Sequence, residues 1–80
     1  MEFEYSKHCI ERMQLRNILK DEVEQVIQFA DKIIDDNDDG HVIYQKLLDG
    51  KYIFRIFVNT IRVPALIKTV YKTSKLSKYL

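Results

Sequence analysis

Side chains able to move a proton or to hold an anion occur near both ends and in the middle of this 80-residue chain. Histidine is the residue type best suited to acid–base chemistry near neutral pH, which makes His8 the natural acid–base candidate. Arg55 and Lys46 would hold a phosphate, with arginine giving the bidentate geometry. Tyr44, Tyr71 or Tyr79 would stack a base or donate a proton, and Tyr71 is the catalytic candidate among them. The expected ligand-binding residues are Arg12, Arg16, Tyr44, Thr73, Lys75 and Tyr79. The basic half of the chain has no carboxylate cluster for Mg²⁺, so the predicted chemistry needs no metal and no cofactor.

Charge divides sharply along the chain. Residues 1–40 hold 5 Lys and Arg against 11 Asp and Glu, while residues 41–80 hold 8 against 1. An uncompensated basic half suits a phosphate-rich or acidic partner. The alternative is that acidic helices lie against a basic sheet and neutralise it.

The stretch 42–59 predicts the hairpin that positions the central candidates. Asp49-Gly50 between two apolar-rich runs indicates a two-residue type I′ turn, because both turn residues must take positive φ. Counting back from a Leu48/Lys51 pair places Tyr44 opposite Arg55. The expected core side carries Ile43, Leu47, Tyr52, Phe54, Ile56 and Val58. The expected open side carries Val42, Tyr44, Lys46, Lys51, Ile53, Arg55 and Phe57.

Two helices are expected before this hairpin. Ser6 is a suitable N-cap for a helix that runs to about Arg16, and Asn17 can take the left-handed conformation at its end. On this helix His8, Arg12 and Arg16 would stand in a row. The second helix, over about 20–30, has a core stripe formed by Val23, Val26, Ile27 and Ala30. Strands are expected at 2–5, 31–36 and 65–73, with Ile67, Thr69, Tyr71 and Thr73 on one side of the last strand.

These elements predict a single α+β domain over residues 1–80. The order is β-α-α followed by three to four antiparallel strands, with both helices packed on one sheet face. So small a domain has a thin core, so a partner or homodimer contact would add to its stability. The single cysteine, Cys9, is expected in the core and fits a reducing cytosol. No apolar run reaches the roughly 20 residues that a membrane span needs, so a cytoplasmic location without membrane association is expected.

Two motifs resemble a known family. They are His8-x-x-x-Arg12-Met13-x-x-Arg16-x-Ile18 and Thr69-Val70-Tyr71-Lys72-Thr73-Ser74-Lys75-x-x-Lys78-Tyr79. Together they resemble a small bacterial family of domains of unknown function that is grouped with the RelE/ParE-like and BrnT-like toxins of type II toxin–antitoxin systems. The chain departs from that pattern at Asn17, Leu19 and Leu80, where relatives usually have glycine, a serine cap and an aromatic residue.

The resemblance implies a RelE-like fold and a toxin that cleaves RNA, on ribosome-bound mRNA, and is held inactive by a cognate antitoxin. Metal-independent cleavage needs a base for the 2′-hydroxyl, cations at the phosphate and an acid for the leaving oxygen. A non-catalytic module that binds nucleic acid or an acidic antitoxin segment remains the alternative. Individual residues also have structural alternatives, since His8 suits a helix cap, and Arg12, Arg16 and Arg55 suit salt bridges to helix carboxylates.

Overall fold

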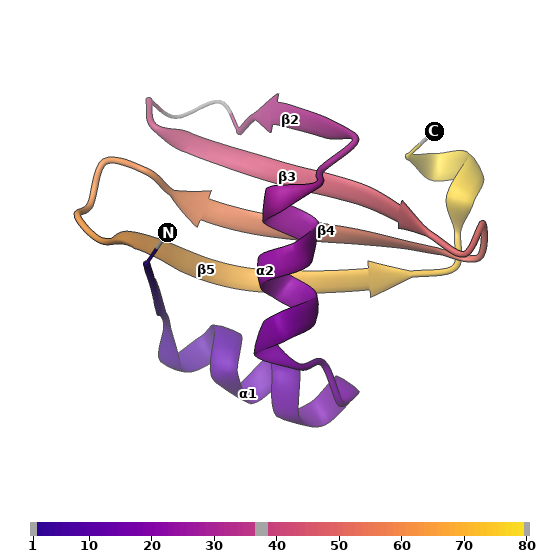
Figure 1. Ribbon diagram of the computed structural model, residues 1–80, viewed down its shortest axis with the longest axis horizontal. Helices are drawn as coiled ribbons and strands as arrows, with labels where there is room; N and C mark the ends of the chain where they lie inside the picture. Colours follow the sequence, from indigo (N-terminus) through magenta and orange to yellow (C-terminus); the bar gives the residue numbers. More distant parts are fainter. Residues whose placement is uncertain (1, 37–38, 80) are drawn as a thin grey trace.

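The computed structural model describes residues 2–36 and 39–79. Its elements are β1 (Phe3–Tyr5), α1 (Lys7–Arg16), α2 (Lys20–Gln28), β2 (Lys32–Asp35), β3 (His41–Leu48), β4 (Tyr52–Asn59), β5 (Ala65–Thr73) and a 3₁₀ turn, η1 (Leu76–Lys78). The strands form one sheet in the order β1-β5-β4-β3-β2. β1 is parallel to β5, and the other neighbouring pairs are antiparallel. The predicted α+β class is confirmed, and Figure 1 shows α2 lying across the sheet with α1 beside β5.

Local signals in the sequence set the helix ends. The Ser6 hydroxyl accepts a hydrogen bond from the Cys9 amide at 3.0 Å, and it also donates to the Lys68 carbonyl at 2.6 Å. The same side chain therefore caps α1 and ties it to β5. Asn17 ends α1 with φ 54°, in the left-handed conformation that its short polar side chain tolerates. Both predicted caps of α1 are confirmed, while α2 ends at Gln28, two residues before the predicted end.

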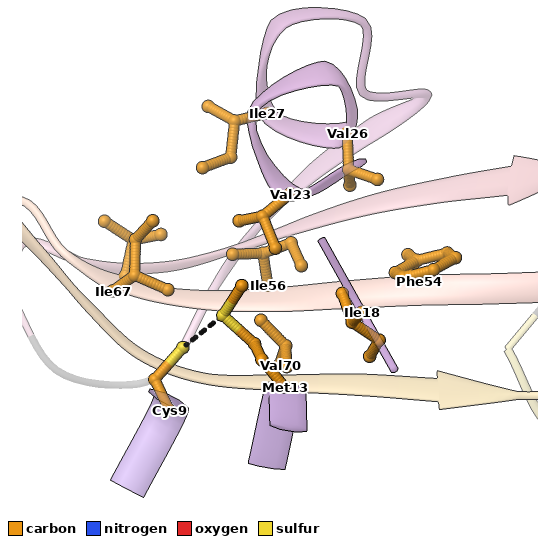
Figure 2. Close-up of a cluster of buried hydrophobic side chains, with 11 residues drawn as sticks. Cys9, Met13, Ile18, Val23, Val26, Ile27, Phe54, Ile56, Ile67 and Val70 are labelled. Carbon is orange, nitrogen blue, oxygen red and sulfur yellow. Dashed lines mark hydrogen bonds between the residues drawn. The ribbon is translucent and has the colours of Figure 1, made fainter. Parts of the chain in front are cut away.

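Both helices bury their apolar stripes against the same face of the sheet. The buried cluster consists of Cys9, Met13, Ile18, Val23, Val26, Ile27, Phe54, Ile56, Val58, Ile67 and Val70. Figure 2 shows side chains of this cluster converging from α1, the α1–α2 connection, α2, β4 and β5, and the Cys9 thiol lies 3.8 Å from the Met13 sulfur. Each large apolar side chain buried in this way contributes about 1.5–3 kcal/mol. Cys9 is a core residue, as predicted. No helix among the described residues is long and apolar enough to span a bilayer.

The register of the β3–β4 hairpin differs from the prediction by one residue. Asp49 and Gly50 both have positive φ, at 57° and 64°, and the Lys51 amide donates to the Leu48 carbonyl, as a type I′ turn requires. Leu48 pairs with Tyr52, however, and leaves Lys51 as an extra residue outside the ladder. The turn type is therefore right and the predicted pairing is wrong.

This extra residue reverses the faces of β3 while those of β4 stay as predicted. A one-residue shift in pairing moves every side chain of a strand to the other face. Phe54, Ile56 and Val58 do face the helices, but they are joined there by Val42, Tyr44, Lys46 and Leu48. The face opposite the helices carries Ile43, Gln45, Leu47, Ile53, Arg55 and Phe57. It is called the open face below because neither α1 nor α2 covers it, although Ile43, Gln45 and Ile53 are buried there. Tyr44 and Lys46 are therefore not on the face of Arg55.

A second irregularity, in the pairing of β4 with β5, changes which residues of β5 share a face. The ladder between β4 and β5 shifts between Phe57 and Val58, so Thr69 pairs with Phe57 while Ile67 pairs with Val58. Lys68 is the extra residue. Thr69, Tyr71 and Thr73 lie on the open face, but Ile67 belongs to the core on the helix side. The predicted grouping of Ile67 with the other three is wrong, because the bulge changes the alternation.

Candidate nucleic-acid interface

Three polar side chains form a row across the middle of the open face. Gln45 on β3 pairs with Arg55 on β4, and Arg55 pairs with Tyr71 on β5. Paired residues share a face, and neighbouring strands lie about 4.8 Å apart, so the three side chains stand side by side. Lys32 on β2 pairs with Gln45 and extends the row to the edge of the sheet.

Arg55 carries a positive charge that its protein contacts leave uncompensated. Its Nε donates to Gln45 Oε1 at 3.1 Å, and its Cζ lies 4.5 Å from the ring centroid of Tyr79 and 5.6 Å from that of Phe57. No carboxylate of residues 2–36 and 39–79 forms an ion pair with it; the ion pairs found there join Lys46 to Asp31, Arg62 to Glu4 and Lys68 to Asp36. A half-buried guanidinium held only by an amide and two rings remains available to an anion.

The C-terminal segment, residues 74–79, folds onto this row. Tyr79 accepts a hydrogen bond at its carbonyl oxygen from Gln45 Nε2 at 3.2 Å, and its ring meets that of Tyr71 edge-on at 6.2 Å. The Lys75 amide donates to the Thr73 hydroxyl oxygen at 3.1 Å, and Lys78 Nζ lies 5.4 Å from the Tyr79 ring. The segment therefore adds an aromatic ring beside Arg55 and two lysines whose charges act on Tyr71.

The surroundings of the Tyr71 phenol lower its pKa. Hydrogen bonds from the hydroxyls of Thr73 and Tyr79 lower its pKa, and the positive charges of Lys78 and Lys75 lower it further, while burial opposes the change. Donors and cations stabilise a phenolate, which is the form that accepts a proton. Arg16 Cζ also lies 5.7 Å from the centroid of this ring. Of the two expected acid–base candidates, His8 and Tyr71, Tyr71 is the one that lies beside Arg55.

The basic stripe of α1 reaches the row only at its C-terminal end. Arg16 contacts the ring of Tyr71. Arg12 and His8 lie one and two turns back, about 6 and 12 Å along the helix axis at 1.5 Å per residue. Both are exposed. Arg16 therefore joins the candidate site, Arg12 lies beside it, and His8 lies farthest from Arg55.

Two predicted site residues are on the opposite side of the sheet. Lys46 Nζ donates to the Phe29 carbonyl at 3.1 Å and lies 3.7 Å from Asp31 Oδ1. Tyr44 packs against the core beneath the helices. The structure thus brings together Arg16, Arg55, Tyr71, Thr73, Lys75 and Tyr79, and it separates Tyr44 and Lys46 from them.

Gln45 and Lys32 are members of the row that residue types alone did not single out. Gln45 is only 3% exposed although it is polar. An amide between two apolar strand neighbours, Ile43 and Leu47, is a usable signal, because a buried polar group needs hydrogen-bond partners. Lys32 has no comparable signal, since an exposed lysine on an edge strand is common.

The carboxylates of α2 lie on the other side of the sheet from the candidate site. The exposed carboxylates of Asp21 and Glu24 lie on α2, which crosses the face opposite Arg55 (Figure 1). The open face and the C-terminal segment carry Arg55, Lys75 and Lys78. Among the described residues, helix carboxylates therefore do not neutralise the candidate site.

Comparisons with known proteins place the chain in one family. No curated protein and no solved structure matches it. The family model described as "Domain of unknown function (DUF4258)" matches residues 5–72, which include α1, α2 and nearly all of the sheet. Of the candidate site, Arg16, Gln45, Arg55 and Tyr71 lie inside the matched range, whereas Thr73, Lys75 and Tyr79 follow it. The chain therefore belongs to the DUF4258 family.

Proposed function

We propose that this domain binds single-stranded RNA on its open face and cleaves it without a metal, as the toxin of a type II toxin–antitoxin system. The main support is one juxtaposition: Arg55, without a carboxylate partner among the described residues, stands beside Tyr71, whose pKa is lowered. The likeness of the two sequence motifs to families grouped with RelE/ParE-like and BrnT-like toxins points in the same direction.

The roles follow from the chemistry of the side chains. Arg55 and Arg16 bind the scissile phosphate and stabilise the negative charge that grows on it. The Tyr71 phenolate takes the proton of the 2′-hydroxyl, and the 2′-oxygen attacks the phosphorus. The bond between phosphorus and the 5′-oxygen breaks, and the 5′-oxygen takes a proton from the Lys75 ammonium. The products are a 2′,3′-cyclic phosphate and a free 5′-hydroxyl. Tyr79 and Phe57 offer ring faces on which unpaired bases stack.

A non-catalytic function for the same surface is the second candidate. The Nη groups of Arg55 fit a carboxylate as well as they fit a phosphate. An acidic segment of an antitoxin would then pair with Arg55 and cover the row. Catalysis separates the two functions, because the pKa of Tyr71 matters only to the cleaving domain.

The test uses a fluorescent single-stranded RNA in buffer with EDTA, and it measures binding by anisotropy and cleavage by gel. We expect Tyr71→Phe to bind RNA like the wild type and to cleave it about 10²–10⁴-fold more slowly. Arg55→Gln should weaken binding and reduce the dependence of log Kd on log salt. Lys46→Gln is the matched control, because it removes a strand cation from the opposite face.

Three outcomes decide the proposal. Unchanged cleavage by Tyr71→Phe would remove the assigned base. RNA binding without cleavage by the wild type would leave the non-catalytic candidate. Equal losses of binding in Arg55→Gln and Lys46→Gln would show that the open face is not the binding surface. Growth arrest on expression that Arg55→Gln abolishes and Lys46→Gln preserves would support the toxin assignment.

A further inference from the structure

Gln45 is a buried polar side chain at the centre of the open face. Gln45 lies between Ile43 and Leu47 along β3 and opposite Arg55 across the ladder. Its side chain is removed from water, and an amide without partners would cost about 1–3 kcal/mol there. Both ends of the amide must therefore be bonded.

Both ends are used, and each reaches a different part of the candidate site. Oε1 accepts from Arg55 Nε at 3.1 Å, while Nε2 donates to the Tyr79 carbonyl at 3.2 Å. Gln45 and Tyr79 are 34 residues apart in the sequence. A single side chain thus joins the guanidinium to the C-terminal segment.

The hydrogen bond between Arg55 and Gln45 leaves the guanidinium able to bind a ligand. Within residues 2–36 and 39–79, Arg55 forms a side-chain hydrogen bond only through Nε, to Gln45, and its Nη groups offer a bidentate contact to a ligand. Because the acceptor is a neutral amide, the guanidinium keeps its full charge. A glutamate at this position would accept the same bond, but it would also neutralise Arg55.

We infer that Gln45 is the positioning residue of the site: it fixes the guanidinium of Arg55 with its Nη edge turned toward a phosphate ligand and holds Tyr79 beside it. The identity of that ligand as RNA rests on the proposed function, whereas the positioning of Arg55 and Tyr79 does not. The sequence motifs did not include Gln45, and its role becomes visible only in the observed register.

Two substitutions separate positioning from simple packing. Gln45→Glu retains the shape and the acceptor but compensates the charge, and we expect RNA affinity to fall about tenfold or more. The slope of log Kd against log salt should fall by about 0.7, the share of one phosphate contact on a single strand. Gln45→Leu keeps the charge of Arg55 and frees its orientation, so affinity should fall severalfold with the slope nearly unchanged. Gln25→Glu, at an exposed position on α2, controls for the change in net charge.

A measurement without RNA tests the inference independently. In ¹H–¹⁵N spectra of the ligand-free protein, the Arg55 Nε–H should exchange with water much more slowly than that of exposed Arg12. Gln45→Leu should abolish the difference and shift the Tyr79 amide signal. If Gln45→Leu does not fold, the exchange rate of the wild-type Arg55 Nε–H and the salt dependence of RNA binding by Gln45→Glu still test the positioning role.

The failures of the two proposals are distinguishable. Fast exchange of the Arg55 Nε–H in the wild type would overturn the positioning role whether or not RNA binds. A salt slope for Gln45→Glu equal to that of Gln25→Glu would overturn the claim that the neutral amide preserves a ligand-binding charge. Slow exchange combined with no RNA binding by the wild type would support the positioning of Arg55 and reject RNA as the ligand.

Discussion

Removing the hydroxyl of Tyr5 should stabilise the protein. The Tyr5 Oη atom is buried and has no hydrogen-bond partner among the described residues, while its ring packs against the core. A buried hydroxyl without a partner costs about 1–3 kcal/mol, so we expect Tyr5→Phe to raise the free energy of unfolding at pH 7 by about 1 kcal/mol. In a domain of this size that change corresponds to an increase in Tm of about 4–8 °C.

The same hydroxyl makes stability depend on pH in the alkaline range. Burial, followed by the nearby negative charges of Glu24, Cys9 and Asp21, raises the pKa of Tyr5 from 10.0 to about 12. Above pH 10 the unfolded chain loses this proton and the folded protein keeps it, so stability falls as the pH rises from 10 toward 12. Two pKa units correspond to at most about 2.7 kcal/mol, and partial exposure of the ring reduces the expected loss to about 1 kcal/mol.

Urea unfolding at pH 7, 9 and 11 tests both effects, with Tyr52→Phe as the control because Tyr52 is 40% exposed. Tyr5→Phe should be more stable than the wild type at pH 7, and the gap should widen at pH 11. Tyr52→Phe should follow the wild type at each pH. A loss of more than about 1 kcal/mol in Tyr5→Phe at pH 7 would mean that the hydroxyl has a partner, and parallel pH curves would refute the raised pKa.

Two capping substitutions should change stability in opposite directions, and thermal unfolding measures both. Leu19→Ser replaces an exposed N-cap residue that has no side-chain acceptor, so it should stabilise α2 by about 1 kcal/mol; a lower Tm would contradict the assignment of the α2 start. Ser6→Ala removes the acceptor for the Cys9 amide and the donor to Lys68, so it should cost about 1–2 kcal/mol. Ser77→Ala is the control for the second change, and an equal effect of the two alanines would deny the capping role.

Patterns within one element were sufficient to predict the helices and the faces of β4. Ser6 and Asn17 lie directly at the ends of α1, and the buried Val23, Val26 and Ile27 repeat at helical spacing. The alternation of Phe54 and Arg55 likewise depends only on the period of a strand. Each of these signals is local, so the sequence alone was enough to read it.

The pairing of β3 with β4 depends on how many residues the turn leaves unpaired, and Asp49-Gly50 does not specify that number. The dipeptide specifies a turn with two positive φ values, but it does not determine whether the next residue enters the ladder. Lys51 stays outside it, and this exchanges Tyr44 for Gln45 beside Arg55. Tyr79 contacts Gln45 across 34 residues of sequence, and no local pattern indicates that contact. The candidate site could therefore be predicted only in part.

The separation of charge has a consequence for how a partner would approach. The net charge is only +1, but the acids of α2 and the cations around Arg55 lie on opposite sides of a molecule that measures 19 Å along its shortest axis. A polyanion would be attracted by the cations around Arg55 and repelled by the acids of α2, so its field would favour encounters in which the side that carries Arg55 and Tyr71 leads. Encounters would then be oriented before any contact forms, and added salt would slow association more than the small net charge suggests, because screening acts within about 8 Å at physiological ionic strength.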